Sequence, residues 1–437
     1  MSFPTRAEIE AGQLEQLRSL LAELFPANKF YSRKLDDAGI TFDVASLADF
    51  SARFPVTTKE ELLADQRASP PFGTNLTYPL ERYTRFHQTS GTTGGPLRWL
   101  DTPESWNGLL ESWTEVLRAA GVGHADRLYF AFSFGPFIGF WLAFESAGRL
   151  GCLCVPGGGL SSAARLRAIL DNGITVLCCT PTYAMRLAEV AREENIELRA
   201  CRVRTIIVAG EPGGSIPAVR ARLAELWPGA RVFDHHGMTE VGPVTYECPA
   251  RPGVLHVIES AYFAEVVEPS SGRSLASGET GELVLTTLGR VSSPLLRYRT
   301  GDLVKLQSPI ANSQGNINPQ ACICGRHEVA LVGGILGRTD DMIVVRGVNV
   351  YPSAVEEIVR GCAGVAEYRA QVNLKNSLTH LSLLVEPRTD CVDPSTLVRT
   401  LEKAFETAFS LRVPISLAPA GSLPRWEMKA QRWQIQR

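Results

Sequence analysis

The sequence predicts an α/β protein with a large N-terminal domain and a small C-terminal α+β domain. Apolar strand-like runs alternate with helical patterns through the middle of the chain, short strands separated by Gly-rich turns follow Glu247, and a compact mixed pattern follows Gly337. The 437 residues exceed what one hydrophobic core normally holds. We therefore expect domains at residues 1–337 and 338–437, with an antiparallel subdomain at about 245–335 in the first.

The N-terminal half begins with a helix signal and continues with buried elements. Thr5 and Glu8 have the spacing of a capping box, which predicts a helix start. The uncharged run 128–144 is short for a membrane span and is interrupted by glycine and proline, so we interpret it as a buried strand followed by the start of a buried helix. The N-terminus also lacks the basic-then-apolar layout of a signal peptide.

A regular alternation of strand and helix patterns occupies the middle of the chain. Strand-like runs lie at 175–180, 203–210 and from 231, and helical patterns lie at 181–196 and 215–227. Such an alternation is typical of βαβ units, so it predicts a largely parallel sheet with helices on its faces.

The last part of the chain predicts antiparallel strands and then a separate α+β pattern. Short strands are expected in AYFAEVVEP, GELVLTTL and LVKLQ. After Gly337, the run MIVVRGVNVYP predicts one strand, and PSAVEEIVRG predicts a helix with Pro352 at its start. Strands in EYRAQVNLKN and THLSLLVEP and a helix in DPSTLVRTLEKAFETAFS complete this pattern.

Composition excludes several classes of partner. The formal net charge is −2 and the pI about 6.4, so we expect neither nucleic acid nor a membrane as partner. Four of the ten cysteines (Cys152, Cys154, Cys178 and Cys179) lie in apolar runs typical of small core residues. A reducing compartment suits them, and we expect a cytoplasmic protein. The sequence leaves a homodimer open.

The first candidate site is a loop rich in glycine and hydroxyl residues. It comprises Thr89, Ser90, Gly91, Thr92, Thr93 and Gly94 and follows a short strand, RYTRFHQ. Close backbone approach and many N–H and hydroxyl donors are what the oxygens of a polyphosphate need. The alternative is a flexible surface turn. The specific composition of this run favours the phosphate-binding interpretation over that alternative.

Two acidic segments are further candidates. Glu240 lies just beyond a predicted parallel strand, where ligands of open α/β sheets bind, and its carboxylate is a suitable Mg²⁺ ligand. Thr239 offers a donor to a phosphate oxygen. Asp302 follows an expected tight turn in RYRTGD and could accept both hydroxyls of a ribose. In isolation, a surface carboxylate is an equally good interpretation of Glu240, and a turn aspartate beside an exposed arginine is the better interpretation of Asp302.

These segments, in this order, resemble the adenylate-forming superfamily of acyl-CoA synthetases, luciferases and peptide-synthetase adenylation domains. The motifs GMTEVGP, YRTGD and especially GRTDDMIVVRGVNVYPSAVEE are similar to the phenylacetate–CoA ligase branch. The resemblance spans about residue 80 to the C-terminus. It implies ATP, Mg²⁺ and coenzyme A as cofactors, a small carboxylic acid as substrate, and a C-terminal domain that moves as a lid.

The resemblance also implies residue roles. The 89–94 loop would bind the ATP phosphates, Glu211 would lie near the adenine pocket, Thr239 would contact the α-phosphate, Glu240 would hold Mg²⁺ and Asp302 the ribose. Residues flanking the adenine would be Asp234, His235, His236, Gly237 and Met238. Arg338 would contact the nucleotide, Asp340 would be the hinge and Lys429 the catalytic lysine. Two departures are Gly95, where relatives often carry lysine, and His236, where an aromatic residue is usual; Arg98 could replace the missing lysine.

An aromatic segment is the candidate acyl pocket. Phe132, Phe134, Phe137, Gly157 and Gly158 could wall an apolar site for an aryl or arylacetic acid. The alternative is ordinary core packing, which accounts for some of these rings.

Four residues are candidate ligands for structural zinc: Cys248, His256, Cys322 and Cys324. Three cysteines and one histidine form a normal closed zinc set, and similar arrangements occur in the branch that the chain resembles. His327 is an alternative fourth ligand, and four unrelated residues are the competing interpretation.

The function expected is activation of an acid with ATP, followed by transfer to coenzyme A. One alternative acceptor is the thiol of a carrier protein, and another substrate is a larger acid such as a deazaflavin cofactor. A nucleotide-binding protein without catalysis is a third alternative, suggested only by Gly95 and opposed by Glu240, Asp302 and Lys429.

Overall fold

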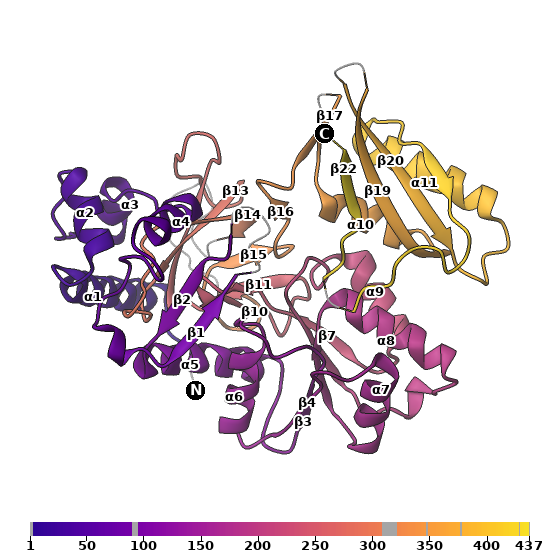
Figure 1. Cartoon of the computed structure of the whole chain (residues 1–437), viewed down its shortest axis with the longest axis horizontal. Helices are drawn as coiled ribbons and strands as arrows, with labels where there is room; N and C mark the ends of the chain where they lie inside the picture. Colours follow the sequence, from indigo (N-terminus) through magenta and orange to yellow (C-terminus); the bar gives the residue numbers. More distant parts are fainter. Residues whose placement is uncertain are drawn as a thin grey trace. The chain divides into compact units, whose positions relative to one another are not determined.

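The computed structural model describes residues 3–89, 95–307, 321–346, 348–375, 378–427 and 429–436. The chain divides into two compact units, residues 1–158 with 233–334, and residues 159–232 with 335–437. Each unit is described by itself (Figure 1). The predicted division into domains at residue 337 stays a prediction.

The first unit begins with helices whose starts are capped as the sequence predicts. Thr5 and Glu8 form a capping box at the first helix, because each side chain accepts from the main chain of the other. A second capping box, of Thr58 and Glu61, starts the fourth helix. The helices are α1 (Arg6–Leu24), α2 (Lys29–Asp37), α3 (Leu47–Arg53), α4 (Lys59–Ala68), α5 (Pro103–Ala119) and α6 (Trp141–Arg149).

The first unit also contains short paired strands. Strands β1 (Arg85–Gln88) and β2 (Arg98–Asp101) are antiparallel and flank the glycine-rich loop. Strands β3 (Arg127–Phe130) and β4 (Leu153–Pro156) are parallel, and β3 and α6 confirm the predicted strand and helix start in the 128–144 run. The short strands β8 (Gly237–Met238) and β9 (Gly242–Pro243) form an antiparallel pair.

The antiparallel strands expected after Glu247 are present in the first unit. Their order is β10-β11-β15-β14-β13-β12. Their bounds are β10 (Thr245–Glu247), β11 (Val254–Val257), β12 (Tyr262–Val267), β13 (Thr280–Thr287), β14 (Tyr298–Gln307) and β15 (Ala330–Val332). The tight turn expected before Asp302 is wrong, because the whole YRTGD motif lies within β14. Pairing with β13 shifts register between Glu282 and Val284, and Gly301 has φ of +77°.

The middle of the chain confirms the predicted βαβ rhythm. Strands β5 (Val176–Cys179) and β6 (Thr205–Val208) are parallel and fully buried. Helices α7 (Ser162–Asp171), α8 (Pro181–Glu193) and α9 (Pro217–Leu226) belong to the same unit, and β7 (Arg231–Asp234) ends the series. Pro181 occupies the first turn of α8, where a missing N–H costs nothing.

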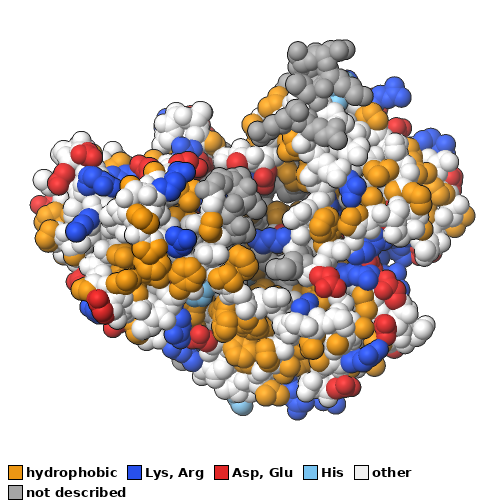
Figure 2. Space-filling model, viewed as in Figure 1, with side chains coloured by type: hydrophobic (Ala, Val, Ile, Leu, Met, Phe, Trp, Pro, Cys, Tyr) orange, Lys and Arg blue, Asp and Glu red, His pale blue; other side chains and the backbone are white. Residues whose placement is uncertain are grey.

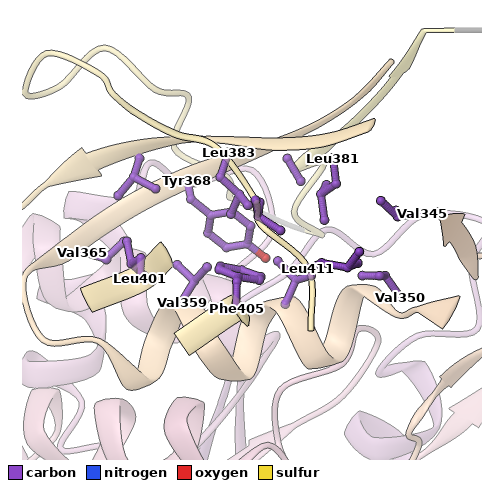
Figure 3. Packing of buried hydrophobic residues seen from close by; sticks show 14 of the residues in the cluster. Val345, Val350, Val359, Val365, Tyr368, Leu381, Leu383, Leu401, Phe405 and Leu411 are labelled. Carbon is purple, nitrogen blue, oxygen red and sulfur yellow. The ribbon is translucent and has the colours of Figure 1, made fainter. Parts of the chain in front are cut away.

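The C-terminal part of the second unit is a sheet covered by helices. Its strand order is β21-β20-β19-β22, with helices α10 (Pro352–Gly361) and α11 (Pro394–Phe409). The strands are β19 (Val365–Lys375), β20 (Leu378–Pro387), β21 (Ile415–Leu417) and β22 (Trp433–Gln436). In Figure 3, Tyr368 and Leu383 from the sheet point toward Val359 and Phe405 from the helices, so the core lies between these two layers.

One expected strand is a hairpin instead. The run MIVVRGVNVYP forms β17 (Ile343–Val345) and β18 (Val348–Val350), which pair antiparallel. Arg346, at the end of β17, has φ of +50°, a left-handed conformation that reverses the chain. The short strand β16 (Gly337–Arg338) precedes this hairpin.

Charge and cysteine patterns agree with the composition. Acidic and basic side chains are interspersed over the face seen in Figure 2. The ten cysteines, all of which lie within the described residues, form no disulfide, and Cys152, Cys178 and Cys179 are buried as expected, whereas Cys154 is half-buried. Within the described residues, no helix is long and apolar enough to cross a membrane.

Candidate active site

The end of β7 is fixed by a buried carboxylate. Glu247 accepts the main-chain N–H of Asp234 at 3.0 Å and that of Gly253 at 2.6 Å. Its side chain is fully buried, so these N–H groups replace the water that a carboxylate otherwise needs. The Asp234 carboxylate in turn accepts the main-chain N–H of His235 at 3.0 Å. The segment predicted to flank the adenine therefore has a rigid start.

His235 is a buried, neutral histidine. Its Nδ1 lies 2.6 Å from the carbonyl oxygen of Thr245, and its ring lies 4.3 Å from that of Trp113 between centroids. Burial lowers the pKa of His235 to about 3, although the contact with Thr245 acts in the opposite direction. At neutral pH, Nδ1–H is therefore the donor to the carbonyl.

Gly237 is required by close packing. A Cβ at this position would lie 2.7 Å from the carbonyl oxygen of Gly242 and 3.2 Å from Nε2 of His235. The first distance is shorter than any ordinary carbon–oxygen contact, so a side chain would displace the β8–β9 pair. The structure thus explains the glycine in the GMTE motif by packing within the segment.

His236 and Asp302 come together from distant segments. Nε2 of His236 lies 3.2 Å from Oδ2 of Asp302, and Asp302 is buried within β14. The main-chain N–H of His236 donates to the Thr245 hydroxyl at 3.0 Å. The predicted adenine-flanking residue and the predicted ribose-binding residue therefore lie side by side, as a single nucleoside site requires.

Thr239 and Glu240 are held from behind by an arginine that sequence analysis did not single out. Arg290 donates from Nη1 to the carbonyls of Thr239 and Glu240 at 3.1 and 2.8 Å. Its Nε and Nη2 each lie 2.6 Å from a carboxylate oxygen of Asp101. Both partners of this ion pair are buried, and the fork geometry fixes the guanidinium plane.

Lys59 is a second residue that sequence analysis missed. Its Nζ lies 3.1 Å from Oε1 of Glu240, whose side chain is otherwise buried. Lys59 begins α4, and nothing in its local sequence distinguishes it from a solvated helix lysine. The site of the predicted Mg²⁺ ligand thus already accommodates a positive charge.

The glycine-rich loop is described only at its ends. Thr89 is buried, donates its N–H to the carbonyl of Leu97 and accepts the Leu97 N–H at its hydroxyl, both at 3.0 Å. These bonds close the base of the loop. Ser90, Gly91, Thr92, Thr93 and Gly94 lie outside the described residues, so their phosphate contacts stay a prediction.

Glu211 and Lys429 lie close together in the second unit. A Cβ at Gly210 would lie 3.6 Å from Cε of Lys429, so the lysine chain passes over this glycine. Glu211 accepts the N–H of Ala430 at 2.9 Å and that of Thr182 at 2.8 Å. Both of its oxygens thus have main-chain partners, and its predicted role near the adenine stays a prediction.

Arg338 and Asp340 form an exposed ion pair, with Nε 2.8 Å from Oδ1. The contact joins two residues of one short segment of the second unit. The predicted nucleotide contact of Arg338 and the hinge role of Asp340 stay predictions.

Three residues of the predicted acyl pocket, Phe132, Phe134 and Gly158, lie next to one another. The Phe132 and Phe134 ring centroids lie 4.8 Å apart, and Phe134 packs edge-on against Trp141 at 4.7 Å. A Cβ at Gly158 would lie 3.5 Å from the Phe132 carbonyl oxygen, and one at Gly157 would clash with Phe130 and Tyr129. Phe137 is 40% exposed, so it is the ring of this segment most open to a ligand.

The predicted zinc ligands form a compact cluster. Ligand atoms of Cys248, His256, Cys322 and Cys324 all lie within 4.8 Å of one another. Two sulfurs, of Cys248 and Cys322, are 3.6 Å apart, and Cys324 Sγ lies 3.5 Å from Nε2 of His256. Tetrahedral zinc with bonds of about 2.3 Å to sulfur and about 2.0 Å to nitrogen spaces its ligands by about 3.5–3.8 Å. The donor set therefore fits a closed zinc site.

Comparison with known families defines the class of protein. Residues 86–290 match the AMP-binding enzyme family, and residues 347–437 match the AMP-binding enzyme C-terminal domain. The chain belongs to the adenylate-forming superfamily.

Within this superfamily, the chain belongs to the phenylacetate–CoA ligase-like branch. It is 34% identical to a phenylacetate–coenzyme A ligase of Thermus thermophilus, over 87% of this chain and 82% of that protein. It is 32% identical to that of Escherichia coli, over 97% of this chain and 94% of that protein. A crystal structure of a 2-hydroxyisobutyryl-CoA ligase in its postadenylation state is 28% identical, with a TM-score of 0.92 over 100% of this chain and 91% of that one.

Proposed function

We propose that this protein activates a small carboxylic acid with ATP as an acyl-adenylate and transfers the acyl group to coenzyme A. The observation that carries the proposal is similarity along nearly the whole chain to phenylacetate–coenzyme A ligases, which includes the segments that place His236 beside Asp302 and Lys429 beside Gly210. Acid-dependent exchange between ATP and pyrophosphate, followed by thioester formation, tests it.

The substrate we propose is an aromatic or arylacetic acid. Similarity to phenylacetate–coenzyme A ligases supports this class, and so does the contact between the rings of Phe132 and Phe134. Apolar walls with few polar groups suit an aromatic ring. Phe137 offers the most accessible surface for such a contact.

The proposed mechanism follows from charge. The acid carboxylate attacks the α-phosphorus of ATP, and negative charge grows on the leaving pyrophosphate. Thr239 would donate to the α-phosphate, and the ammonium group of Lys429 would stabilise the charge that develops in the transition state. Asp302 and His236 would hold the nucleoside so that the two reactants stay aligned.

Glu240 is the residue that would hold Mg²⁺. Its carboxylate is buried, and the ammonium group of Lys59 lies 3.1 Å from it. A negative charge in such surroundings favours a cation electrostatically. When bound, the ion supplies charge neutralisation for the phosphates. Arg290, behind the main chain of Glu240, would keep the carboxylate in place.

A structural zinc ion is part of the proposal, held by Cys248, His256, Cys322 and Cys324. Apolar residues Val254 and Ala330 pack around the cysteines, which limits water at the site. A closed set of four protein ligands leaves no position for substrate, so zinc would stabilise the antiparallel subdomain and would take no part in the chemistry.

The proposal also covers the movement of the C-terminal lid and the location of the protein. Asp340 acts as the hinge about which the C-terminal lid swings between the two half-reactions. A cytoplasmic location suits the cysteine content, and a homodimer stays a prediction.

A further inference from the structure

Polar contacts hold the chain on both sides of Lys429. The anchored residues are Arg425, Glu427, Ala430 and Arg432. Their partners fall into two groups, one within the C-terminal sheet and one in residues 159–232.

The first group of anchors stays with the C-terminal sheet. Arg432 binds both carboxylate oxygens of Glu367, at 2.7 and 3.1 Å, and Arg425 binds Glu386 at 3.1 Å. Burial opposes the charge on Glu367, but Arg360 and Arg432 prevail and lower the pKa of Glu367 to about 2. These contacts join parts of one C-terminal sheet and would move together with Lys429. The same two arginines also reach α8, since Arg425 lies 3.3 Å from Glu189 and Arg432 donates to the Thr182 hydroxyl at 3.4 Å, so they contribute to the second group as well.

The second group reaches residues outside that sheet. The hydroxyl of Ser162 donates to Glu427 at 2.9 Å, and the N–H of Ala430 donates to Glu211 at 2.9 Å. The other oxygen of Glu211 accepts the N–H of Thr182 in the first turn of α8. N–H groups at a helix start lack intrahelical acceptors and favour a carboxylate, so Glu211 is itself held in one orientation.

A cavity of about 430 Å³ lies next to Thr182, whose N–H binds Glu211, and is also lined by Glu189, Arg425 and Arg432. The Lys429 segment is held on this side by hydrogen bonds, which break more readily than a packed apolar interface because water can replace each bond.

We propose that Glu211, assisted by Ser162, is a positioning residue that seats the Lys429 segment for adenylation and releases it for thioester formation. The inference rests on the proposed function and extends it. Glu211 acts through the main chain of Ala430, next to Lys429, and touches no reacting atom. Gly210 leaves room for the lysine chain above the same loop.

The test combines single-turnover kinetics with a double-mutant cycle. Glu211→Gln retains one acceptor oxygen and loses the second, so the seated pose becomes less populated. Hydrogen bonds to charged groups are strong enough that adenylation should slow by about ten- to hundredfold. KM for ATP and for the acid should stay within about twofold, because no ligand contact changes. Glu225→Gln, at an exposed helix ion pair, is the matched control.

Combining Glu211→Gln with Lys429→Ala shows whether the slower adenylation in Glu211→Gln depends on Lys429. In Lys429→Ala protein, Glu211→Gln should cause no further loss, since there is no ammonium group left to position. Conversion of preformed acyl-adenylate to thioester should be unchanged or faster in Glu211→Gln. A raised KM for ATP with an unchanged adenylation rate would overturn the inference, because it would show that Glu211 contributes to binding of the adenine and not to the position of Lys429. An additional loss in the Lys429→Ala background would also overturn it.

Amide hydrogen exchange supplies a readout that needs no activity. The Ala430 N–H should exchange faster in Glu211→Gln than in the wild type, whether or not the wild type forms any acyl-adenylate. Unchanged exchange of the Ala430 N–H would contradict the proposed role of Glu211. Faster exchange in the variant, together with a wild type that forms no acyl-adenylate, would count against the proposed function alone. Should Glu211→Gln fail to fold, Ser162→Ala is judged by the same criteria with a smaller expected effect.

Discussion

The Nδ1 atom of His235 lies 2.6 Å from the carbonyl oxygen of Thr245, and both residues are buried. This contact joins the end of β7 to β10 and is possible with a neutral imidazole whose proton is on Nδ1. The histidine next to the predicted nucleoside site is therefore a packing group, while His236 faces Asp302.

Acid should destabilise the protein through His235. Burial lowers its folded pKa to about 3, whereas the unfolded value is about 6.5. The stability this group contributes is fully present above about pH 6.5 and is lost as the pH falls toward 3. We expect a loss of about 2 kcal/mol in the free energy of unfolding between about pH 8 and about pH 5.

Denaturant titrations at several pH values measure this loss. His235→Asn keeps an N–H donor for Thr245 without a titrating ring, so its stability should depend less on pH than that of the wild type. His124→Asn, at an exposed position, is the control. Equal pH dependence in all three proteins would show that His235 does not carry the effect.

Zinc should be present at one ion per chain, bound by Cys248, His256, Cys322 and Cys324. Elemental analysis of protein purified without added metal measures it. The Cys322→Ser/Cys324→Ser double variant should lose the ion and melt several °C below the wild type, because the free energy of zinc binding contributes directly to folding and each kcal/mol lost shifts the midpoint by about 2–4 °C in a domain of about 150–250 residues. Its ranking of acids should not change.

A matched pair outside the cluster controls for general effects of removing thiols. Cys201→Ser/Cys362→Ser replaces two half-buried cysteines and should keep the zinc. Full zinc retention in the Cys322→Ser/Cys324→Ser variant would contradict the assignment.

Phe137→Ala should change which acids are preferred. If the exposed ring lines the acyl pocket, its removal alters contacts differently for aryl, arylacetic and aliphatic acids. We expect the ratio of kcat/KM between the best aromatic and the best aliphatic acid to fall by about tenfold. Phe42→Ala removes another exposed ring, stacked on Phe25, and should leave the ratio unchanged. An unaltered ratio in Phe137→Ala would place this ring outside the pocket.

Lys429→Ala should impair only the first half-reaction. An ammonium group that acts on the adenylation transition state is worth about 10²–10³ in rate. We expect acyl-adenylate formation to slow by that factor, and thioester formation from preformed acyl-adenylate to stay near the wild-type rate. Lys403→Ala, on the exposed face of α11, is the control.

The hinge variant should show the opposite pattern. Asp340→Pro restricts φ at the hinge, so the lid should not swing even though adenylation remains possible. Single-turnover measurements of both half-reactions compare the two variants. Equal impairment of both halves by Lys429→Ala would contradict a lid with two poses.

The regular elements could be predicted because their signals are local. Strand β5 and helix α8 were expected from apolar periodicity and from Pro181, and the capping box of Thr5 was expected from spacing alone. The hairpin at Arg346 was not expected, because an arginine with positive φ gives no turn signal in the sequence.

Site residues could be predicted only where a motif carries them. Asp302 and Glu240 belong to motifs, but Lys59 and Arg290 reach Glu240 from distant segments, and no periodicity marks them. The contact of Glu211 with Ala430 is of the same kind, since a main-chain N–H has no residue signature.

Acid-dependent exchange of labelled pyrophosphate into ATP, with coenzyme A then added, tests the central claim most directly. The panel contains aryl, arylacetic and fatty acids, each measured with the wild type and with Lys429→Ala. We predict that an aromatic or arylacetic acid supports exchange, that coenzyme A then yields its thioester with release of AMP, and that Lys429→Ala abolishes most of the exchange. Exchange with none of the acids, or an acyl-adenylate that coenzyme A does not consume, would contradict the assignment.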